Sequence, residues 1–179
     1  VGLGPVGLAA LMLCRAIGAR NIYGIESSQF RIDLANKLGL ADKVLKAGPD
    51  NVKEILDLTG GKGVEKAFDA SASDAGRQTA IRAARQWGKI AFIGEGGTVS
   101  FNPSPDIIHQ QKSIYGSWVT SIWLMENLVE ELVRWNLHPD ALVTHRFPLE
   151  QADEAYRLMN EGNCGKVAVC QDEALEAGR

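Results

Sequence analysis

The chain has 179 residues, of which 45% are hydrophobic and 23% are charged. This length is enough for a domain with a buried core, and the composition is typical of a globular protein. The formal net charge is -3 and the sequence has no run of basic residues. We therefore expect neither nucleic acid nor an anionic membrane surface as a partner.

The cysteines are too far apart in the sequence for a zinc pair or a disulfide framework. They are Cys14, Cys164 and Cys170. We expect small buried apolar residues in a reducing compartment, which predicts a cytoplasmic protein. No apolar stretch reaches the length of a membrane span.

The first residues of the chain form a glycine pattern. Gly2, Gly4 and Gly7 have the spacing G-x-G-x-x-G. In dinucleotide-binding turns one glycine makes the turn, one lets the backbone approach a pyrophosphate, and one lets the helix pack closely on the strand. Pro5 and Val6 would begin the helix, whose N-terminus would face the phosphates. By itself the pattern is weak, because many glycine-rich turns bind no ligand.

An acidic residue follows the next predicted strand. Residues 21–25 are a short apolar run that ends in Glu26, and a dinucleotide fold places a ribose-binding carboxylate about 20 residues after its glycines. The alternative is a solvated charge at a strand end. A carboxylate repels a 2′-phosphate, so NAD is favoured over NADP. Ser27 and Arg31 could receive such a phosphate, but beside the acid we expect Arg31 to reach the ribose or cover the adenine.

Strand and helix patterns alternate along the rest of the chain. Helices are expected over residues 6–17 and after residues 28, 50, 74 and 121. Asp74 is expected to cap its helix, and the helix after residue 121 is expected to bury Leu124, Leu128, Leu132 and Val133. Strands are expected over residues 21–25, 43–45, 64–70, 88–93 and 113–118, with a short edge strand over residues 98–101. This alternation predicts a Rossmann-type α/β fold with a doubly wound parallel sheet, which binds ligands at the carboxyl ends of its strands.

Two parts of the chain differ in pattern. Residues 1–137 are predicted to form the dinucleotide-binding domain, and its first strand is expected to be truncated, as in a fragment of a longer protein. Residues 138–179 form a strand, helix and strand that do not continue the repeat. We expect this C-terminal segment to pack on a catalytic domain missing from the chain.

Several motifs occur together and in order. They are GLGPVG at residues 2–7, Glu26 with Arg31, FDAS at residues 68–71, GKIAFIG at residues 88–94, VTHRFPL at residues 143–149 and GKV at residues 165–167. With these motifs the chain resembles the coenzyme-binding half of the zinc-type medium-chain dehydrogenases/reductases, the alcohol dehydrogenase superfamily. The last two motifs resemble the polyol, threonine and general alcohol dehydrogenase branches, which they do not separate.

The resemblance implies a set of cofactor-binding residues. The pyrophosphate would lie on Gly4, Pro5 and Val6, and the adenine ribose on Glu26 beside Arg31. The adenosine side would be lined by Ser71 and Ala72, and the nicotinamide side by Ile93, Gly94, Gly116 and Ser117. Lys166 aligns with a basic residue that reaches the pyrophosphate in relatives; its alternative is a solvated lysine.

The resemblance also implies a homodimer and a substrate. Two segments, one from Thr98 to Asn102 and one from Ser113 to Trp118, would pair across a two-fold axis. The substrate of the parent enzyme would be a small alcohol or polyol.

The catalytic zinc of the family is bound upstream of the glycine motif, in a region that this chain lacks. His109, His138 and His145 have no spacing that supplies three zinc ligands. We therefore assign no catalytic residue and no metal ligand here. Zinc is expected only in the missing catalytic domain, and this chain alone is expected to be inactive.

Two other classes of protein remain open from the sequence. An S-adenosylmethionine-dependent methyltransferase also uses a glycine turn and an acid after the second strand. A non-catalytic regulatory module could sense NAD through the same fold.

Overall fold

The computed structural model describes residues 1–171, so the end of the predicted C-terminal segment, residues 172–179, lies outside the described residues. The helices are α1 (Pro5–Ala16), α2 (Gln29–Lys37), α3 (Asn51–Leu58), α4 (Asp74–Ala83), α5 (Ile122–Arg134) and α6 (Ala152–Glu161). The strands are β1 (Tyr23–Glu26), β2 (Lys43–Lys46), β3 (Val64–Asp69), β4 (Ala84–Phe92), β5 (Ser113–Gly116), β6 (Val143–Pro148) and β7 (Lys166–Cys170). Short helical turns are η1 (Ser104–Ile108), η2 (Pro139–Leu142) and η3 (Leu149–Gln151).

The first five strands are parallel and form two sets, β1 with β2 and β3 with β4 and β5. Residues 1–3 lie between the two sets. The Gly2 N–H donates to the Ile25 carbonyl at 2.9 Å, and the Ala70 N–H donates to the Val1 carbonyl at 2.9 Å. The order across the sheet is therefore β2, β1, residues 1–3, β3, β4 and β5.

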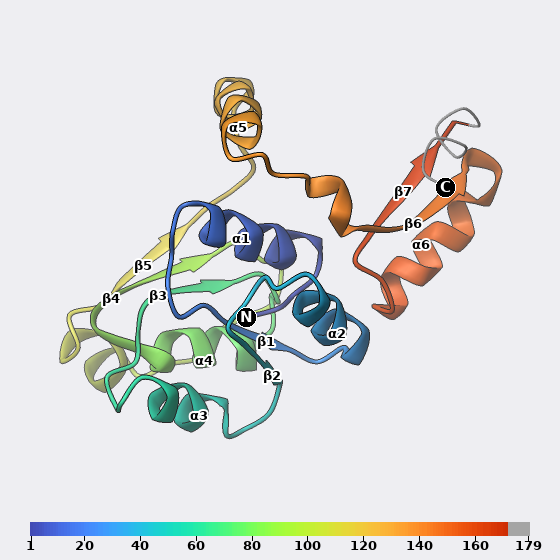
Figure 1. Cartoon of the computed structure of the whole chain (residues 1–179). Helices are drawn as coiled ribbons and strands as arrows, with labels where there is room; N and C mark the ends of the chain where they lie inside the picture. Colours follow the sequence, from blue (N-terminus) through green and yellow to red (C-terminus); the bar gives the residue numbers. More distant parts are fainter. Residues whose placement is uncertain (172–179) are drawn as a thin grey trace.

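Helices cover both faces of this sheet, with α1 on one face and α3 and α4 on the other (Figure 1). Leu8 and Leu11 of α1 pack with Leu3 and Ile22 in one core cluster. A second core cluster contains Ile25, Leu45, Ile55 and Ala83. Burial on both faces is expected of a central parallel strand. The predicted Rossmann-type doubly wound fold is confirmed.

A separate unit follows η2, in which β6 and β7 form a parallel pair packed with α6 (Figure 1). Leu142 of η2 belongs to the core cluster of α1. Two hydrogen bonds attach the unit to α2: the Ser28 hydroxyl donates to the Gly162 carbonyl at 2.9 Å, and the Arg31 Nε donates to the Cys164 carbonyl at 3.0 Å. The domain boundary at residue 137 remains a prediction.

The edge strand predicted over residues 98–101 is wrong, because no strand forms there. Side chains of α4 take up its backbone groups instead. Asp74 accepts from the Ser100 N–H at 2.8 Å, and Arg77 donates to the Thr98 carbonyl at 3.3 Å. The dimer contact predicted for this segment remains a prediction.

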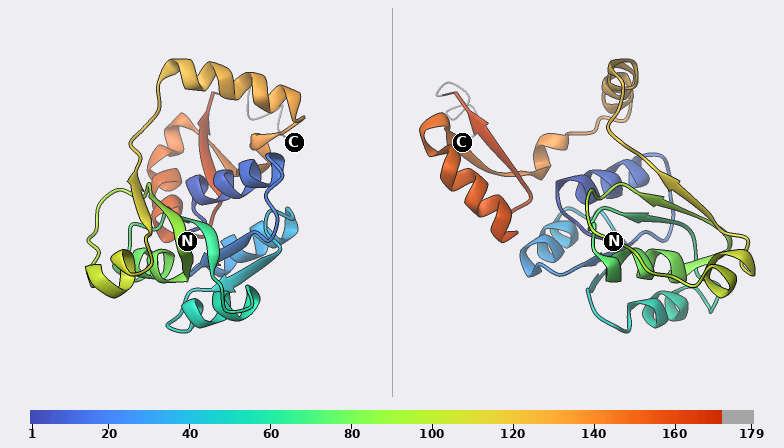
Figure 2. Two further views of the ribbon diagram at one scale, coloured as in Figure 1. Left: turned by 90° about the vertical axis from the view of Figure 1, so that its left-hand side faces the viewer. Right: turned by 180° about the vertical axis from the view of Figure 1, so that it is seen from behind.

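The apolar side chains of α5 were expected to be buried, and this is wrong for most of them. Leu124 is 55% exposed, Leu128 39% and Val133 77%. The reason is that α5 stands clear of the sheet in every view (Figures 1 and 2). Among residues 1–171 no helix is long and apolar enough to span a membrane.

Candidate dinucleotide-binding site

The glycine turn leads directly into α1, with Gly4 before the helix and Pro5 at its first position. The first hydrogen bond of the helix runs from the Leu8 N–H to the Gly4 carbonyl at 2.9 Å. The N–H groups of Val6 and Gly7 therefore have no intrahelical acceptor. Together with the positive end of the helix dipole, these groups suit an anion at this turn.

The three glycines of the turn differ in what surrounds them. A Cβ on Gly7 would lie 1.9 Å from the Gly2 carbonyl oxygen, and a Cβ on Gly2 would lie 2.7 Å from the backbone of Ser71. At Gly4 the nearest atom is in the Arg31 guanidinium, 3.7 Å away. Close packing thus explains the first and third glycines, whereas the backbone at Gly4 is open to a ligand.

Glu26 ends β1 and is only 5% exposed. Its Oε1 accepts from the N–H groups of Ser27 at 2.7 Å and Ser28 at 2.8 Å, and from the Ser27 hydroxyl at 3.1 Å. Its Oε2 accepts from the Leu3 N–H. Burial opposes ionisation, but the hydrogen bonds from Ser28, Leu3 and Ser27 outweigh it and hold the pKa of Glu26 below its ordinary value.

Glu26 and Ser27 line a cleft of about 560 Å³ together with Gly2 and Ser71. Glu26 and Ser27 lie at the carboxyl end of β1, and Ser71 follows the carboxyl end of β3. Gly2 lies in the glycine turn, which is placed between these two strands in the sheet. Doubly wound sheets bind ligands at this edge. The cleft also includes residues that sequence reasoning missed, which follow β2 and begin α3: Ala47, Gly48, Pro49, Asn51 and Val52. Their position after a parallel strand is the signal that could have identified them.

Arg31 contacts the C-terminal unit, and its predicted role beside the adenine ribose remains a prediction. Its side chain runs between the glycine turn and the loop before β7, where it donates to the Cys164 carbonyl and approaches Gly4. It does not line the cleft that contains Glu26. The contact with Cys164 joins residues far apart in the sequence, so no local pattern could have revealed it.

The residues predicted for the nicotinamide side lie together. Gly116 pairs with Phe92 across β5 and β4, and the Ser117 N–H donates to the Phe92 carbonyl at 3.2 Å. The N–H groups of Ile93 and Gly94 donate to the Asp69 carbonyl at 2.9 and 3.1 Å. The carboxyl ends of three neighbouring strands therefore meet here.

Lys166 begins β7 and is exposed. Within residues 1–171 it forms no hydrogen bond or ion pair with the glycine turn. Its role at the pyrophosphate remains a prediction.

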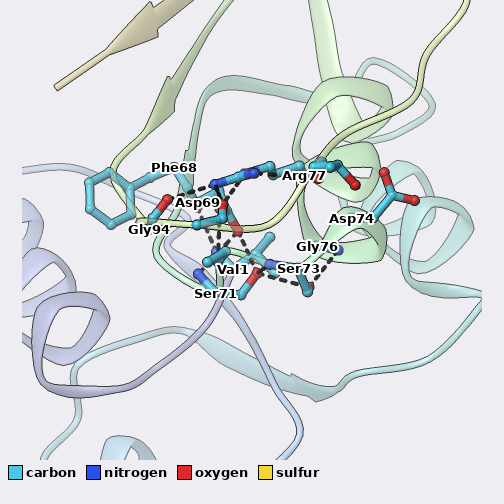
Figure 3. Close-up of polar contacts among 12 residues, drawn as sticks. Val1, Phe68, Asp69, Ser71, Ser73, Asp74, Gly76, Arg77 and Gly94 are labelled. Carbon is cyan, nitrogen blue, oxygen red and sulfur yellow. Dashed lines mark hydrogen bonds and ion pairs between the residues drawn. The ribbon is translucent and has the colours of Figure 1, made fainter.

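Sequence reasoning also missed a buried ion pair beside these loops (Figure 3). The Arg77 Nε lies 3.4 Å from Oδ2 of Asp69, a side chain with no exposed surface. Asp69 accepts hydrogen bonds from the N–H and hydroxyl of Ser71 and from the Ala72 N–H. Arg77 is in register with Ala80 and Ile81 on the buried stripe of α4, and that helical spacing was the available signal.

No group of three or more His, Cys, Asp and Glu side chains in residues 1–171 could hold a metal ion.

The parallel strand order, the open glycine turn and the buried acid one strand away define the class of this molecule as an α/β domain of the Rossmann type. Comparison with known proteins specifies the family. A family model described as "Zinc-binding dehydrogenase" matches residues 5–135. The chain therefore belongs to this family, the zinc-type medium-chain dehydrogenases that its motifs resemble.

Individual relatives agree with this assignment. The chain is 44% identical to an uncharacterized zinc-type alcohol dehydrogenase-like protein of Escherichia coli K12, over 94% of the chain and 48% of the relative. It is 32% identical to L-threonine 3-dehydrogenase of Pyrococcus furiosus, over 93% of the chain and 49% of the relative. The crystal structure of an NAD-dependent alcohol dehydrogenase superimposes with a TM-score of 0.79 at 29% identity, over 95% of this chain and 49% of that one. The chain thus spans about half the length of these relatives.

Proposed function

We propose that this chain is the NAD-binding part of a zinc-type alcohol or polyol dehydrogenase and that it positions the nicotinamide for hydride transfer. The observation that carries the proposal is the buried, ionised Glu26 in a cleft next to an open glycine turn. When bound, NAD supplies the hydride chemistry. The residues of this chain supply binding and orientation.

The glycine turn would bind the pyrophosphate through the free N–H groups of Val6 and Gly7. Gly4 fits this role, because a Cβ there would occupy the open approach to the backbone. Arg31 lies 3.7 Å from that Cβ position, so its charge is next to the place proposed for the phosphates.

Glu26 would accept hydrogen bonds from the hydroxyls of the adenosine ribose. Its Oε2 accepts only the Leu3 N–H within the described residues, whereas Oε1 already accepts three hydrogen bonds. A carboxylate oxygen has room for a second donor, so Oε2 can receive a hydroxyl. A 2′-phosphate in the same place would meet a fixed negative charge, which favours NAD over NADP.

The remaining predicted residues divide between the two halves of the cofactor. Ser71 lines the cleft with Glu26, which supports the adenosine side. Ile93, Gly94, Gly116 and Ser117 lie at the ends of β4 and β5, and we propose that they contact the nicotinamide ribose and ring.

The substrate class follows from relatives rather than from this chain. The relative from Pyrococcus furiosus is an L-threonine 3-dehydrogenase, and threonine carries a secondary alcohol. We propose a small alcohol or polyol as the substrate of the whole enzyme. We further propose that the chain alone does not catalyse, and that the whole enzyme is a homodimer through the edge of the sheet that includes β5.

The proposal is tested by calorimetric titration of the chain with NAD, NADP and S-adenosylmethionine. We expect NAD to bind most tightly. Replacing Glu26 with Ala removes a hydrogen bond to a charged acceptor, so NAD affinity should fall by about tenfold or more and discrimination against NADP should relax.

The matched control is Glu65→Ala, which removes an acid that is 71% exposed and pairs with Arg85. Its NAD affinity should equal that of the wild type. Preferred binding of S-adenosylmethionine, or unchanged selectivity in Glu26→Ala, would contradict the proposal. Family membership already favours the dehydrogenase over a methyltransferase.

A further inference from the structure

Arg77 extends from α4 to the loop that follows β4 (Figure 3). Its Nη2 donates to the Gly94 carbonyl at 2.6 Å and to the Gly96 carbonyl at 2.7 Å. Its Nη1 donates to the Thr98 carbonyl at 3.3 Å. One guanidinium thus holds three alternate carbonyls of residues 94–98.

The charge of Arg77 is matched inside the protein. Its Nε lies 3.4 Å from Asp69 Oδ2, and its Cζ lies 5.5 Å from the centroid of the Phe92 ring. The same Asp69 side chain accepts the Ser71 and Ala72 N–H groups. A single buried ion pair therefore fixes the loop after β3 and the loop after β4 at once.

These two loops are also in direct backbone contact. A Cβ on Gly97 would lie 2.0 Å from the Ala72 carbonyl oxygen, and a Cβ on Gly94 would lie 2.5 Å from the Ala72 nitrogen. Ala72 has a φ of 58°, which is uncommon for a residue with a side chain. The loop shape consequently depends on close packing and on the carbonyl bonds to Arg77.

In residues 94–98 the carbonyl groups and the N–H groups differ in their hydrogen bonding. Arg77 binds carbonyls, whereas the N–H groups of residues 95–98 donate no hydrogen bond to any part of the chain that the structure describes. Backbone N–H groups at the end of a parallel strand are the usual donors to a bound ligand. Because Arg77 binds the carbonyls of this loop, the N–H groups of residues 95–98 remain available to donate to a ligand.

We infer that Arg77 is a positioning residue that sets the shape of residues 94–98 for the nicotinamide half of the cofactor. This inference rests on the proposed NAD-binding function and deepens it. Arg77 acts through the loop backbone and through Asp69, and it does not line the cleft of the adenosine half. Its loss should therefore weaken one half of the cofactor site selectively.

The test compares NAD with ADP-ribose, which lacks the nicotinamide ring, in calorimetric titrations of the wild-type chain and Arg77→Met. We expect the variant to lose about tenfold in NAD affinity and to change its ADP-ribose affinity by less than about twofold. With NADH, the change in nicotinamide fluorescence on binding should also be smaller in the variant. A role confined to folding would not separate the two ligands.

The matched control is Arg85→Met, since Arg85 forms an exposed ion pair with Glu65 at the other end of the sheet. It should bind both ligands as the wild type does. If Arg77→Met does not fold, Arg77→Lys retains the charge beside Asp69 but loses the planar fork, and it should show the same selective loss of NAD affinity.

Equal weakening of both ligands, or unchanged binding of both, would overturn the role of Arg77 while leaving the proposed function intact. If the wild-type chain binds neither ligand, the proposed function fails and this inference fails with it.

Discussion

Glu26, at the end of β1, connects two other parts of the site through one side chain. Its carboxylate accepts N–H groups from the glycine turn at Leu3 and from the start of α2 at Ser27 and Ser28. A ligand that binds this carboxylate meets a group whose position is already fixed. Less ordering is then needed on binding, which favours affinity.

The lowered pKa of Glu26 predicts how stability depends on pH. The unfolded carboxyl has a pKa of about 4.3, and the folded pKa lies below its ordinary value. The ionised form therefore stabilises the fold above the unfolded pKa, and this contribution is lost as the pH falls through the folded pKa. Urea denaturation from pH 6 to about 3 should show a steeper loss of unfolding free energy in the wild type than in Glu26→Gln. Parallel pH profiles would contradict the assignment.

Gly7 makes a second residue-scale prediction, because a Cβ there would overlap the Gly2 carbonyl oxygen at 1.9 Å. The backbone of the turn must move to admit it. Gly7→Ala should lower the unfolding free energy by about 1–3 kcal/mol or more in urea denaturation. Gly48→Ala is the matched control, since its nearest atom would be 3.9 Å away, and it should change stability by less than about 0.5 kcal/mol. Equal losses of unfolding free energy in Gly7→Ala and Gly48→Ala would show that the close approach of Gly7 to Gly2 does not determine stability.

At the scale of elements, the start of α2 binds the C-terminal unit. Its N-cap side chain forms no hydrogen bond with the helix itself. Ser28 occupies the N-cap position but makes no cap hydrogen bond, because its hydroxyl donates to the Gly162 carbonyl. Arg31, in the first turns of the same helix, donates to Cys164. The unit of β6, α6 and β7 is thus attached next to the site proposed for the cofactor.

Removal of the Ser28 hydroxyl should loosen this attachment. In Ser28→Ala, backbone amides of residues 143–170 should exchange hydrogen faster by about three- to tenfold, as expected for the loss of one hydrogen bond. Amides of β3 and β4 should be unchanged. Ser100→Ala is the control, because only its backbone N–H has a partner in the structure. Unchanged hydrogen exchange in Ser28→Ala would show that the remaining contacts hold the C-terminal unit in place without this hydrogen bond.

The order of strands and helices was predictable because apolar periodicity is a local property. Glycine spacing likewise predicted the turn, and Glu26 followed from its distance along the chain. The helix caps were less predictable. Asp74 was expected to cap α4, but Ser73 does so by accepting the Gly76 N–H at 3.0 Å, and Asp74 binds Ser100 instead.

The errors share a physical cause, which is that the partner lies far away in the sequence. Residues 98–101 have a strand-like composition. The backbone groups of this segment nevertheless form hydrogen bonds with the side chains of Asp74 and Arg77 and do not pair with another strand. The ion pair of Asp69 and Arg77 was missed for the same reason. Sequence patterns show which residues are apolar or charged, but they do not show which distant group each one meets.

At the scale of the whole molecule, α5 presents a large apolar surface. Ile122 is 73% exposed, Trp123 68% and Val129 60%. The apolar face of α5 was correctly predicted from the sequence, but its exposure was not. Periodicity shows which face of a helix is apolar, and it does not show whether another part of the molecule covers that face. Exposed apolar patches of this kind mark interaction surfaces or aggregation liabilities.

Residues 1–3 have a consequence for how the molecule responds to heat. They provide the only hydrogen-bonded joint between β1 and β3 within the residues described, through Gly2 and Ile25 on one side and Val1, Phe68 and Ala70 on the other. The core cluster of Ile25, Leu45, Ile55 and Ala83 also includes residues from both sides of this joint. The two halves are therefore coupled by residues 1–3 and by packed side chains. A dinucleotide seated on the glycine turn would contact both halves, so its binding should raise the temperature at which they unfold.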